Sequence, residues 1–189
     1  MVQSEDFPLK VVCFETETTG LIANRAVRDS ALPRIIDFYA ALVDLDSDDP
    51  PAREIEYLLD PGKGSEIPEK VTKITGLTLA DLRGRPRFFD VATEIRDFME
   101  SGEAVLAHNC SFDREVLQIE LDRAGVPIEW PRCICTVEQT MHLRGHRMNL
   151  GDLHEMLFGK RHPDAHRARS DAEATIRVAR ELRKRGELE

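Results

Sequence analysis

The sequence has few cysteines, no long apolar run and no excess of positive charge. Four cysteines in 189 residues argue against a disulfide scaffold. No apolar stretch reaches the roughly 18 residues of a membrane-spanning helix, and the N-terminal MVQSEDFPLK lacks the apolar core of a secretory signal. With 26 Lys+Arg against 35 Asp+Glu the formal net charge is −9, which disfavours charge-driven binding to duplex DNA or anionic membranes. We therefore expect a reduced, cytoplasmic protein with no membrane contact.

Length and composition predict one globular domain over residues 1–189, because 41% of the residues are hydrophobic and 32% are charged. Apolar, β-branched runs predict five strands, and an acidic turn joins the second and third into a hairpin. The strands are expected at residues 10–16, 35–45, 53–59, 104–107 and 132–137. Amphipathic spacing predicts helices after them, at residues 88–101, 111–124, 137–144, 149–158 and 170–185, with Ser111 as an N-cap and short helical pieces between 61 and 86. This order predicts an α/β fold in which helices pack on a mixed sheet.

Two glutamates stand at the end of the first predicted strand. Residues two apart point to the same face of a strand, so Glu15 and Glu17 share a side with Val11 and Cys13. Two like charges at the end of a buried strand repel each other, and a divalent metal ion would offset them. An exposed strand end with two solvated glutamates explains the pattern equally well.

Two further acids lie in the first turns of predicted helices. Asp113 is followed by Leu117 and Leu121, and Asp171 by Thr175 and Val178, at spacings that put both acids on the core-facing side. The helix dipole alone also favours an acid in this position. A metal-ligand role and a purely electrostatic role therefore both remain open.

His166 precedes Asp171 by five residues and is expected in the loop that enters the last helix. An imidazole titrates near pH 6.5 and can accept a proton from water at neutral pH. The four carboxylates carry a charge of −4, which two Mg²⁺ or Mn²⁺ ions would balance, and such a set suits two-metal hydrolysis of a phosphodiester. Taken alone, a histidine is more often structural or exposed.

Three motifs occur in order along about residues 9–182: FETETTGL at 14–21, AHNCSFD at 107–113 and HRARSDA at 166–172. They resemble the motifs of the DEDDh group of 3′-to-5′ exonucleases, the superfamily of the bacterial polymerase III proofreading subunit. The resemblance implies a ribonuclease H-like fold with a mixed five-stranded sheet flanked by helices. It also implies release of nucleoside monophosphates from single-stranded 3′ ends of DNA, which we favour, or RNA, and a replication or repair polymerase as a partner.

The resemblance assigns roles residue by residue. The two metal ions would be held by Glu15, Glu17, Asp113 and Asp171, and His166 would be the general base. The residues that would line the pocket for the terminal nucleotide are Thr18, Leu21, His108, Asn109 and Phe112.

One position departs from the family pattern, because the first acid is usually Asp and here is Glu15. The extra methylene moves the carboxylate by roughly 1 Å, and a misplacement of that size can cost about a hundredfold in rate. The alternative reading is therefore a weakened or silenced member of the same fold that binds nucleic-acid ends or a partner protein.

A zinc site is a second alternative, formed by Cys133 and Cys135 with His142 and His146. The C-x-C spacing is tighter than usual for zinc, and both cysteines fall on one face of a predicted buried strand, which favours core packing. The segment 166–185 holds seven Lys/Arg against three Asp/Glu. It is the best candidate for phosphate contact, although a solvated helix face explains this charge more simply.

Overall fold

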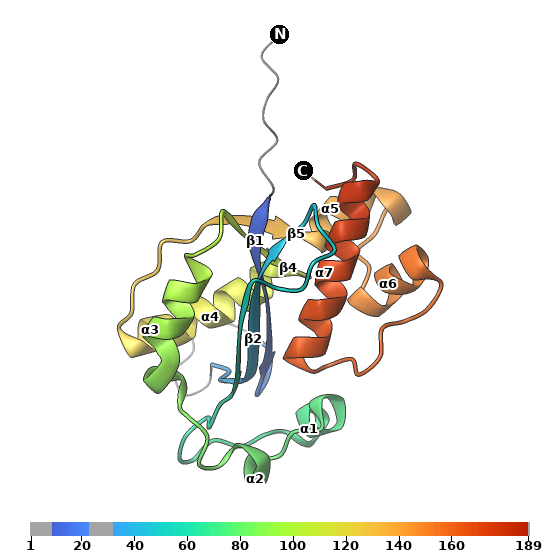
Figure 1. The fold of residues 1–189 in the computed structure, drawn as a ribbon. Helices are drawn as coiled ribbons and strands as arrows, with labels where there is room; N and C mark the ends of the chain where they lie inside the picture. The colour runs from blue at the N-terminus through green and yellow to red at the C-terminus, as the bar shows by residue number, and fades with distance from the viewer. Residues whose placement is uncertain (1–8, 23–31, 189) are drawn as a thin grey trace.

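The computed structural model describes residues 9–22 and 32–188, which form a five-stranded mixed sheet with helices on both faces (Figure 1). The strand order is β3-β2-β1-β4-β5. The pairs β1–β2 and β2–β3 are antiparallel, whereas β1–β4 and β4–β5 are parallel. The strands are β1 (Lys10–Thr18), β2 (Ile35–Asp44), β3 (Arg53–Leu58), β4 (Ala104–Ala107) and β5 (Arg132–Cys135). The predicted mixed sheet is confirmed, as is the hairpin of its second and third strands.

The first strand continues two residues beyond its predicted end. Its register with β2 shifts between Glu17 and Thr18, so that Glu17 lies opposite Asp37 and Thr18 opposite Ile35. The strand geometry therefore persists through both glutamates, and the alternation that places Glu15 and Glu17 on one face is maintained to the end.

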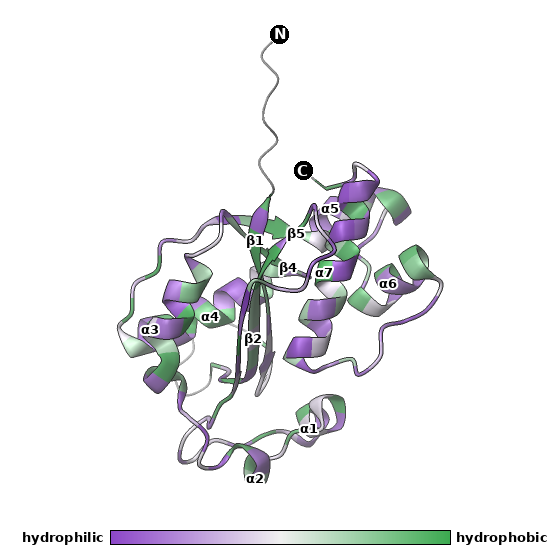
Figure 2. Ribbon diagram, in the orientation of Figure 1, coloured by the Kyte–Doolittle hydropathy of each residue, from purple (hydrophilic) through white to green (hydrophobic). Residues whose placement is uncertain are grey.

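One face of the sheet is covered by α7 (Ala168–Lys184), with α5 (Thr136–Arg144) and α6 (Leu150–Phe158) beside it. The other face is covered by α3 (Phe88–Met99) and α4 (Cys110–Ala124). Figure 2 shows hydrophobic residues along the central strands and mixed polar and apolar faces on the helices. Each helix thus buries one stripe against the sheet, as the spacing predicts. No helix within 9–22 and 32–188 is long and apolar enough to cross a membrane.

Two short helices, α1 (Glu69–Thr75) and α2 (Leu79–Leu82), lie beyond the end of the sheet at which β1 finishes (Figure 1). A small apolar cluster that includes Ile36, Leu77 and Leu82 anchors them to β2. This attachment brings α1 alongside the end of β1.

The prediction of Ser111 as an N-cap is wrong. The helix begins one residue earlier, at Cys110, and its N-cap is Asn109, which has a left-handed backbone with φ of 67°. Asparagine tolerates this conformation better than most residues, and a left-handed residue turns the chain sharply from β4 into α4. Asp113 therefore lies in the first turn of α4, just past the end of β4.

Candidate active site

The site begins with the two glutamates of β1. Glu15 and Glu17 are both half-buried, and their strand neighbours Val11 and Cys13 belong to the core under α7. Burial raises the pKa of Glu15 well above its usual range, and the nearby charges of Asp113 and Asp171 raise it further. Burial and the charge of Asp171 likewise raise the pKa of Glu17 to about 8. The two side chains therefore lie close to the other predicted acids.

Asp113 is held from β1 by a neighbouring threonine. Its Oδ1 accepts hydrogen bonds from the Thr16 backbone N–H at 3.1 Å and from the Thr16 hydroxyl at 2.6 Å. Only 2% of Asp113 is exposed, and burial raises its pKa to about 7 although both hydrogen bonds act to lower it. Thr16 was not predicted as a site residue, and its place between the two glutamates is the sequence signal that could have identified it.

Asp171 is held from the loop before α7. The backbone N–H of His166 lies 3.2 Å from each of its carboxylate oxygens, and His162 Nε2 lies 2.7 Å from its Oδ1. His166 adopts a left-handed backbone with φ of 68°, a conformation that costs a non-glycine residue free energy and is concentrated at functional sites. The structure thus places His166 in the entry loop next to Asp171, as predicted, and adds His162, which the sequence analysis did not single out.

Glu17 and Asp171 lie close enough together to share a divalent cation, with His166 beside them. Ligand atoms of Glu17, His166 and Asp171 all lie within 4.8 Å of one another. Carboxylate oxygens are the ligands that Mg²⁺ and Mn²⁺ prefer. Burial, with a smaller contribution from the neighbouring acids, raises the pKa values of Glu15, Glu17 and Asp113, and a bound cation would favour their ionised forms. The residues present therefore fit a metal site.

An ion pair between Asp37 and Arg167 lies beside this cluster. Asp37, opposite Glu17 on β2, is buried, and its Oδ2 accepts a hydrogen bond at 2.8 Å from Arg167 Nε. The positive charge of Arg167 also opposes the rise in the pKa of Glu17 and acts to lower it. Sequence reasoning missed Asp37, although it is the single acid within the otherwise apolar run IIDFYAALV.

A cavity of about 510 Å³ opens next to the acids. Three of the predicted pocket residues, Thr18, Leu21 and Phe112, line it together with His166. Leu21 is 78% exposed, so a large apolar side chain stands at the mouth of the cavity with no cover from the described residues. Lys70 of α1 contributes a positive charge to the opposite wall.

The other two predicted pocket residues do not line this cavity. His108 directs Nδ1 to the Thr136 hydroxyl at 2.8 Å and Nε2 to the Met148 carbonyl at 3.2 Å, and burial lowers its pKa to about 4. The Asn109 side chain accepts a hydrogen bond from Arg147 at 2.5 Å. Both residues therefore tie the turn between β4 and α4 to the segments around α5 and α6.

The alternative zinc site is not assembled. Cys133 and Cys135 pack into the core beneath α3 and α4, whereas His142 Nε2 lies 2.7 Å from Glu187. Among the described residues, these four side chains form no group within metal-binding distance. Core packing of the two cysteines is thus the reading that agrees with the geometry.

The chain is similar to proteins of an exonuclease family. The exonuclease family model RNase_T matches residues 12–179. DNA polymerase III subunit epsilon of Treponema pallidum is 32% identical over 173 residues, which cover 89% of this chain and 72% of that protein. PolC-type DNA polymerase III of Streptococcus suis is 31% identical over 170 residues, covering 88% of this chain. The chain spans only 11% of the length of that polymerase.

Solved structures share the fold. The nuclease domain of 3′hExo, described as a DEDDh family member bound to rAMP, superposes with a TM-score of 0.76 at 15% identity and covers 98% of each chain. Exonuclease I of E. coli in complex with a dT13 oligonucleotide gives a TM-score of 0.75 at 20% identity, covering 94% of this chain and 41% of that one. At these identities the likeness concerns the fold alone, which is ribonuclease H-like.

Proposed function

This chain belongs to the exonuclease family, within the DEDDh 3′-to-5′ superfamily, and from that premise we propose that it removes nucleoside monophosphates from single-stranded 3′ ends. DNA is the favoured substrate because the relatives that share about a third of its residues are DNA polymerase III proteins. The same relatives support a replication or repair DNA polymerase as its partner.

The observation that carries this proposal is the convergence of four acids from three separate elements. Glu15 and Glu17 come from β1, Asp113 from the start of α4 and Asp171 from the start of α7. Burial and the charge of Asp171 raise the pKa values of Glu15, Glu17 and Asp113, and a ligand of opposite charge would favour their ionised forms.

We propose that these four carboxylates hold two Mg²⁺ or Mn²⁺ ions. Such ions supply an activated water and stabilise the charge that develops on the leaving oxygen. Thr16 fixes the orientation of Asp113 through its two hydrogen bonds, so that this carboxylate does not have to reorganise during the reaction.

His166 is the proposed general base. Its backbone N–H is bonded to Asp171, while its side chain reaches both the acid cluster and the cavity. It can therefore accept the proton of a water that attacks the terminal phosphodiester. The left-handed backbone of His166 supports this role, because backbone strain of this kind is concentrated at active sites, where side chains are held in fixed orientations.

The cavity beside the acids is the proposed pocket for the terminal nucleotide. Leu21 and Phe112 provide apolar surfaces for the terminal bases, and Thr18 lines the floor near the acids. His108 and Asn109 contribute less directly, because their hydrogen bonds fix the turn that carries Asp113.

A test uses a 5′-labelled single-stranded DNA oligonucleotide incubated with the protein in Mg²⁺ and in Mn²⁺. A ladder that shortens from the 3′ end is expected, together with its loss in excess chelator and in Asp171→Asn. Release of the label as a mononucleotide from the start, with no labelled strands of intermediate length, would indicate attack from the 5′ end and contradict the proposal. Full activity in chelator would contradict it as well.

A second candidate is a silenced member that only binds nucleic-acid ends, and Glu15 is the observation that favours it. This reading predicts binding of the oligonucleotide without shortening in either metal. Activity gained only in Glu15→Asp would support the silenced reading, whereas a 3′-shortened ladder from the wild-type protein would exclude it.

A further inference from the structure

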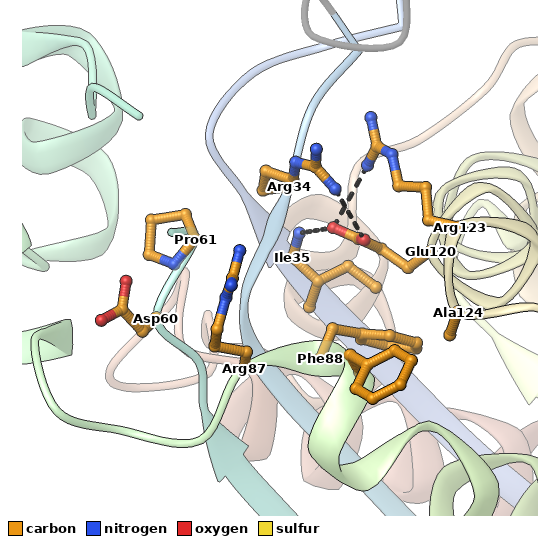
Figure 3. Close-up of a pocket in the computed structure, with 10 residues that line it drawn as sticks. Arg34, Ile35, Asp60, Pro61, Arg87, Phe88, Glu120, Arg123 and Ala124 are labelled. Carbon is orange, nitrogen blue, oxygen red and sulfur yellow. Dashed lines mark hydrogen bonds and ion pairs between the residues drawn. The ribbon is translucent and has the colours of Figure 1, made fainter. Parts of the chain in front are cut away.

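A second polar cavity of about 530 Å³ lies away from the acid cluster. Its walls come from the start of β2, the segment after β3, the start of α3 and the end of α4 (Figure 3). Three arginines line it, Arg34, Arg87 and Arg123. In a chain with a formal net charge of −9, three guanidinium groups around one cavity are a local concentration of positive charge.

Two of these arginines converge on one buried carboxylate. Glu120 is 3% exposed, and its oxygens lie 3.3 Å from Arg34 Nη1 and 3.3 Å from Arg123 Nη1. It also accepts the backbone N–H of Ile35 at 3.2 Å. The shared carboxylate holds both arginines at the cavity wall.

The third arginine is available to a ligand. Arg87 is exposed, and in the described part of the chain its guanidinium makes no hydrogen bond or ion pair. It lies over Gly62, where a Cβ atom would come within 2.6 Å of the guanidinium. Among the described residues that line the cavity, the one further acid is Asp60, which already accepts hydrogen bonds from the N–H groups of Gly62 at 2.8 Å and Gly84 at 3.4 Å.

An exposed aromatic side chain stands at the same cavity. Phe89, the residue after buried Phe88, is 72% exposed. Guanidinium groups beside an aromatic face are the combination that binds single-stranded nucleic acid, since the cations contact phosphates and the ring stacks on a base. The cavity is therefore suited to a nucleotide unit and not to an isolated anion alone.

This cavity adjoins the proposed nucleotide pocket. Thr19 lines that pocket, and its backbone N–H donates to the Arg34 carbonyl at 2.9 Å. The Arg34 N–H in turn donates to the Thr19 hydroxyl at 3.0 Å. Residues 19 and 34 thus form a shared wall between the two cavities.

We propose that the arginine-lined cavity is a second nucleic-acid subsite, which binds a nucleotide of the strand upstream of the 3′ end. In this subsite Arg87 contacts a phosphate, Phe89 stacks on a base, and the Arg34–Glu120–Arg123 group forms the adjoining wall. This inference rests on the proposed function, because it assumes that the 3′ end of the strand occupies the pocket lined by Leu21 and Phe112.

Binding of 5′-fluorescent oligothymidylates tests the subsite. Fluorescence anisotropy is measured in chelator, where hydrolysis is not expected, with lengths from two to about twelve nucleotides, which span the usual site sizes. Affinity of the wild type should rise with length. For the longest oligonucleotide, Arg87→Ala should bind about three- to tenfold more weakly, and its slope of log K against log salt should shrink by roughly 0.7, the value for one phosphate contact to a single strand.

Arg83→Ala is the matched control, since it removes the same charge from an exposed residue of the same segment that does not line the cavity. It should leave the slope and the length dependence unchanged. Phe89→Ala should weaken binding of long oligonucleotides several-fold with no change in slope. The proposed subsite would be wrong if Arg87→Ala and the wild type had equal slopes of log K against log salt. It would also be wrong if Arg87→Ala lost the same fraction of its affinity for the dinucleotide as for the longest strand.

A small substrate separates this inference from the proposed function. The 4-nitrophenyl ester of thymidine 5′-monophosphate occupies only the terminal pocket, so Arg87→Ala and Phe89→Ala should hydrolyse it at the wild-type rate. If the wild type fails to hydrolyse both this ester and the oligonucleotides, the proposed function fails, yet the salt slopes still decide the subsite. If Arg87→Ala alone loses ester hydrolysis, the residue belongs to the terminal pocket and the second subsite is wrong.

Discussion

Nε2 of His162 lies 2.7 Å from Oδ1 of Asp171, and both residues are buried. Among the described residues His162 Nδ1 has no hydrogen-bond partner, an arrangement that costs free energy in a buried ring. The contact with Nε2 therefore fixes the orientation of Asp171, although it leaves Nδ1 without a hydrogen bond among the described residues. We infer that His162 is a positioning residue for the proposed metal ligand.

Replacement of His162 should weaken metal binding more than it weakens folding. We expect His162→Ala to raise the Mn²⁺ concentration for half-maximal activity by about 10–100-fold, the range for partners that orient metal ligands. His162→Gln, which retains a donor, should recover part of the loss, and exposed His146→Ala should have no effect. An unchanged Mn²⁺ requirement in a folded His162→Ala protein would contradict the positioning role.

The acid cluster should make the metal-free protein less stable as the pH rises. Burial and the charge of Asp171 raise the pKa of Glu17 from 4.5 to about 8, so between these values the folded state keeps a proton that the unfolded state has lost. The free energy of unfolding therefore falls with rising pH across this window. Thermal unfolding in chelator should show a falling Tm from pH 5 to 8, by roughly 2–4 °C for each kcal/mol lost.

A bound metal ion should reverse the loss of stability with rising pH. A cation needs ionised carboxylates, so Mn²⁺ should raise the Tm more at pH 8 than at pH 6. Glu17→Gln should flatten the pH dependence in chelator and reduce the rise with Mn²⁺, whereas exposed Glu66→Gln should change neither. A Tm in chelator that is constant between pH 5 and 8 would show that the cluster does not hold protons.

Local patterns were sufficient to predict the framework of the sheet. The strand at residues 104–107 was predicted at the bounds that the structure has, because AVLA is apolar and both faces of β4 are buried. Extension of β1 to Thr18 was not predicted, since its last pairs depend on a register shift with β2. That shift is a long-range contact, and no local pattern in the strand encodes it.

The candidate site likewise has residues that local patterns could predict and residues whose roles depend on distant contacts. Alternation and helical spacing placed Glu15, Glu17, Asp113 and Asp171 on the inward faces of their own elements, and the family motifs then implied their role as metal ligands. His162 and Asp37 were missed, since their roles come from partners 9 and 130 residues away. His108 and Asn109 fit the family motif, yet their orientation depends on segments around α5 and α6 that lie far along the chain.

Loss of the His166 side chain should remove most of the activity. General-base catalysis contributes about 10²–10⁴-fold, so His166→Ala should lower kcat by at least about a hundredfold on the single-stranded oligonucleotide. The backbone N–H bonded to Asp171 remains in this variant, so the Mn²⁺ requirement should change little. Near wild-type turnover in His166→Ala would remove this residue from the mechanism.

Shortening the first acid should increase the rate. Glu15 is half-buried among Asp113, Asp171 and Glu17, and its extra methylene displaces the carboxylate by roughly 1 Å from the position an aspartate would occupy, which can cost up to about a hundredfold. We expect Glu15→Asp to raise kcat in Mg²⁺, whereas Glu66→Asp, an exposed residue outside the cluster, should leave it unchanged. A lower or equal kcat in Glu15→Asp would mean that the surrounding backbone already accommodates the longer side chain, and that Glu15 is part of a working site.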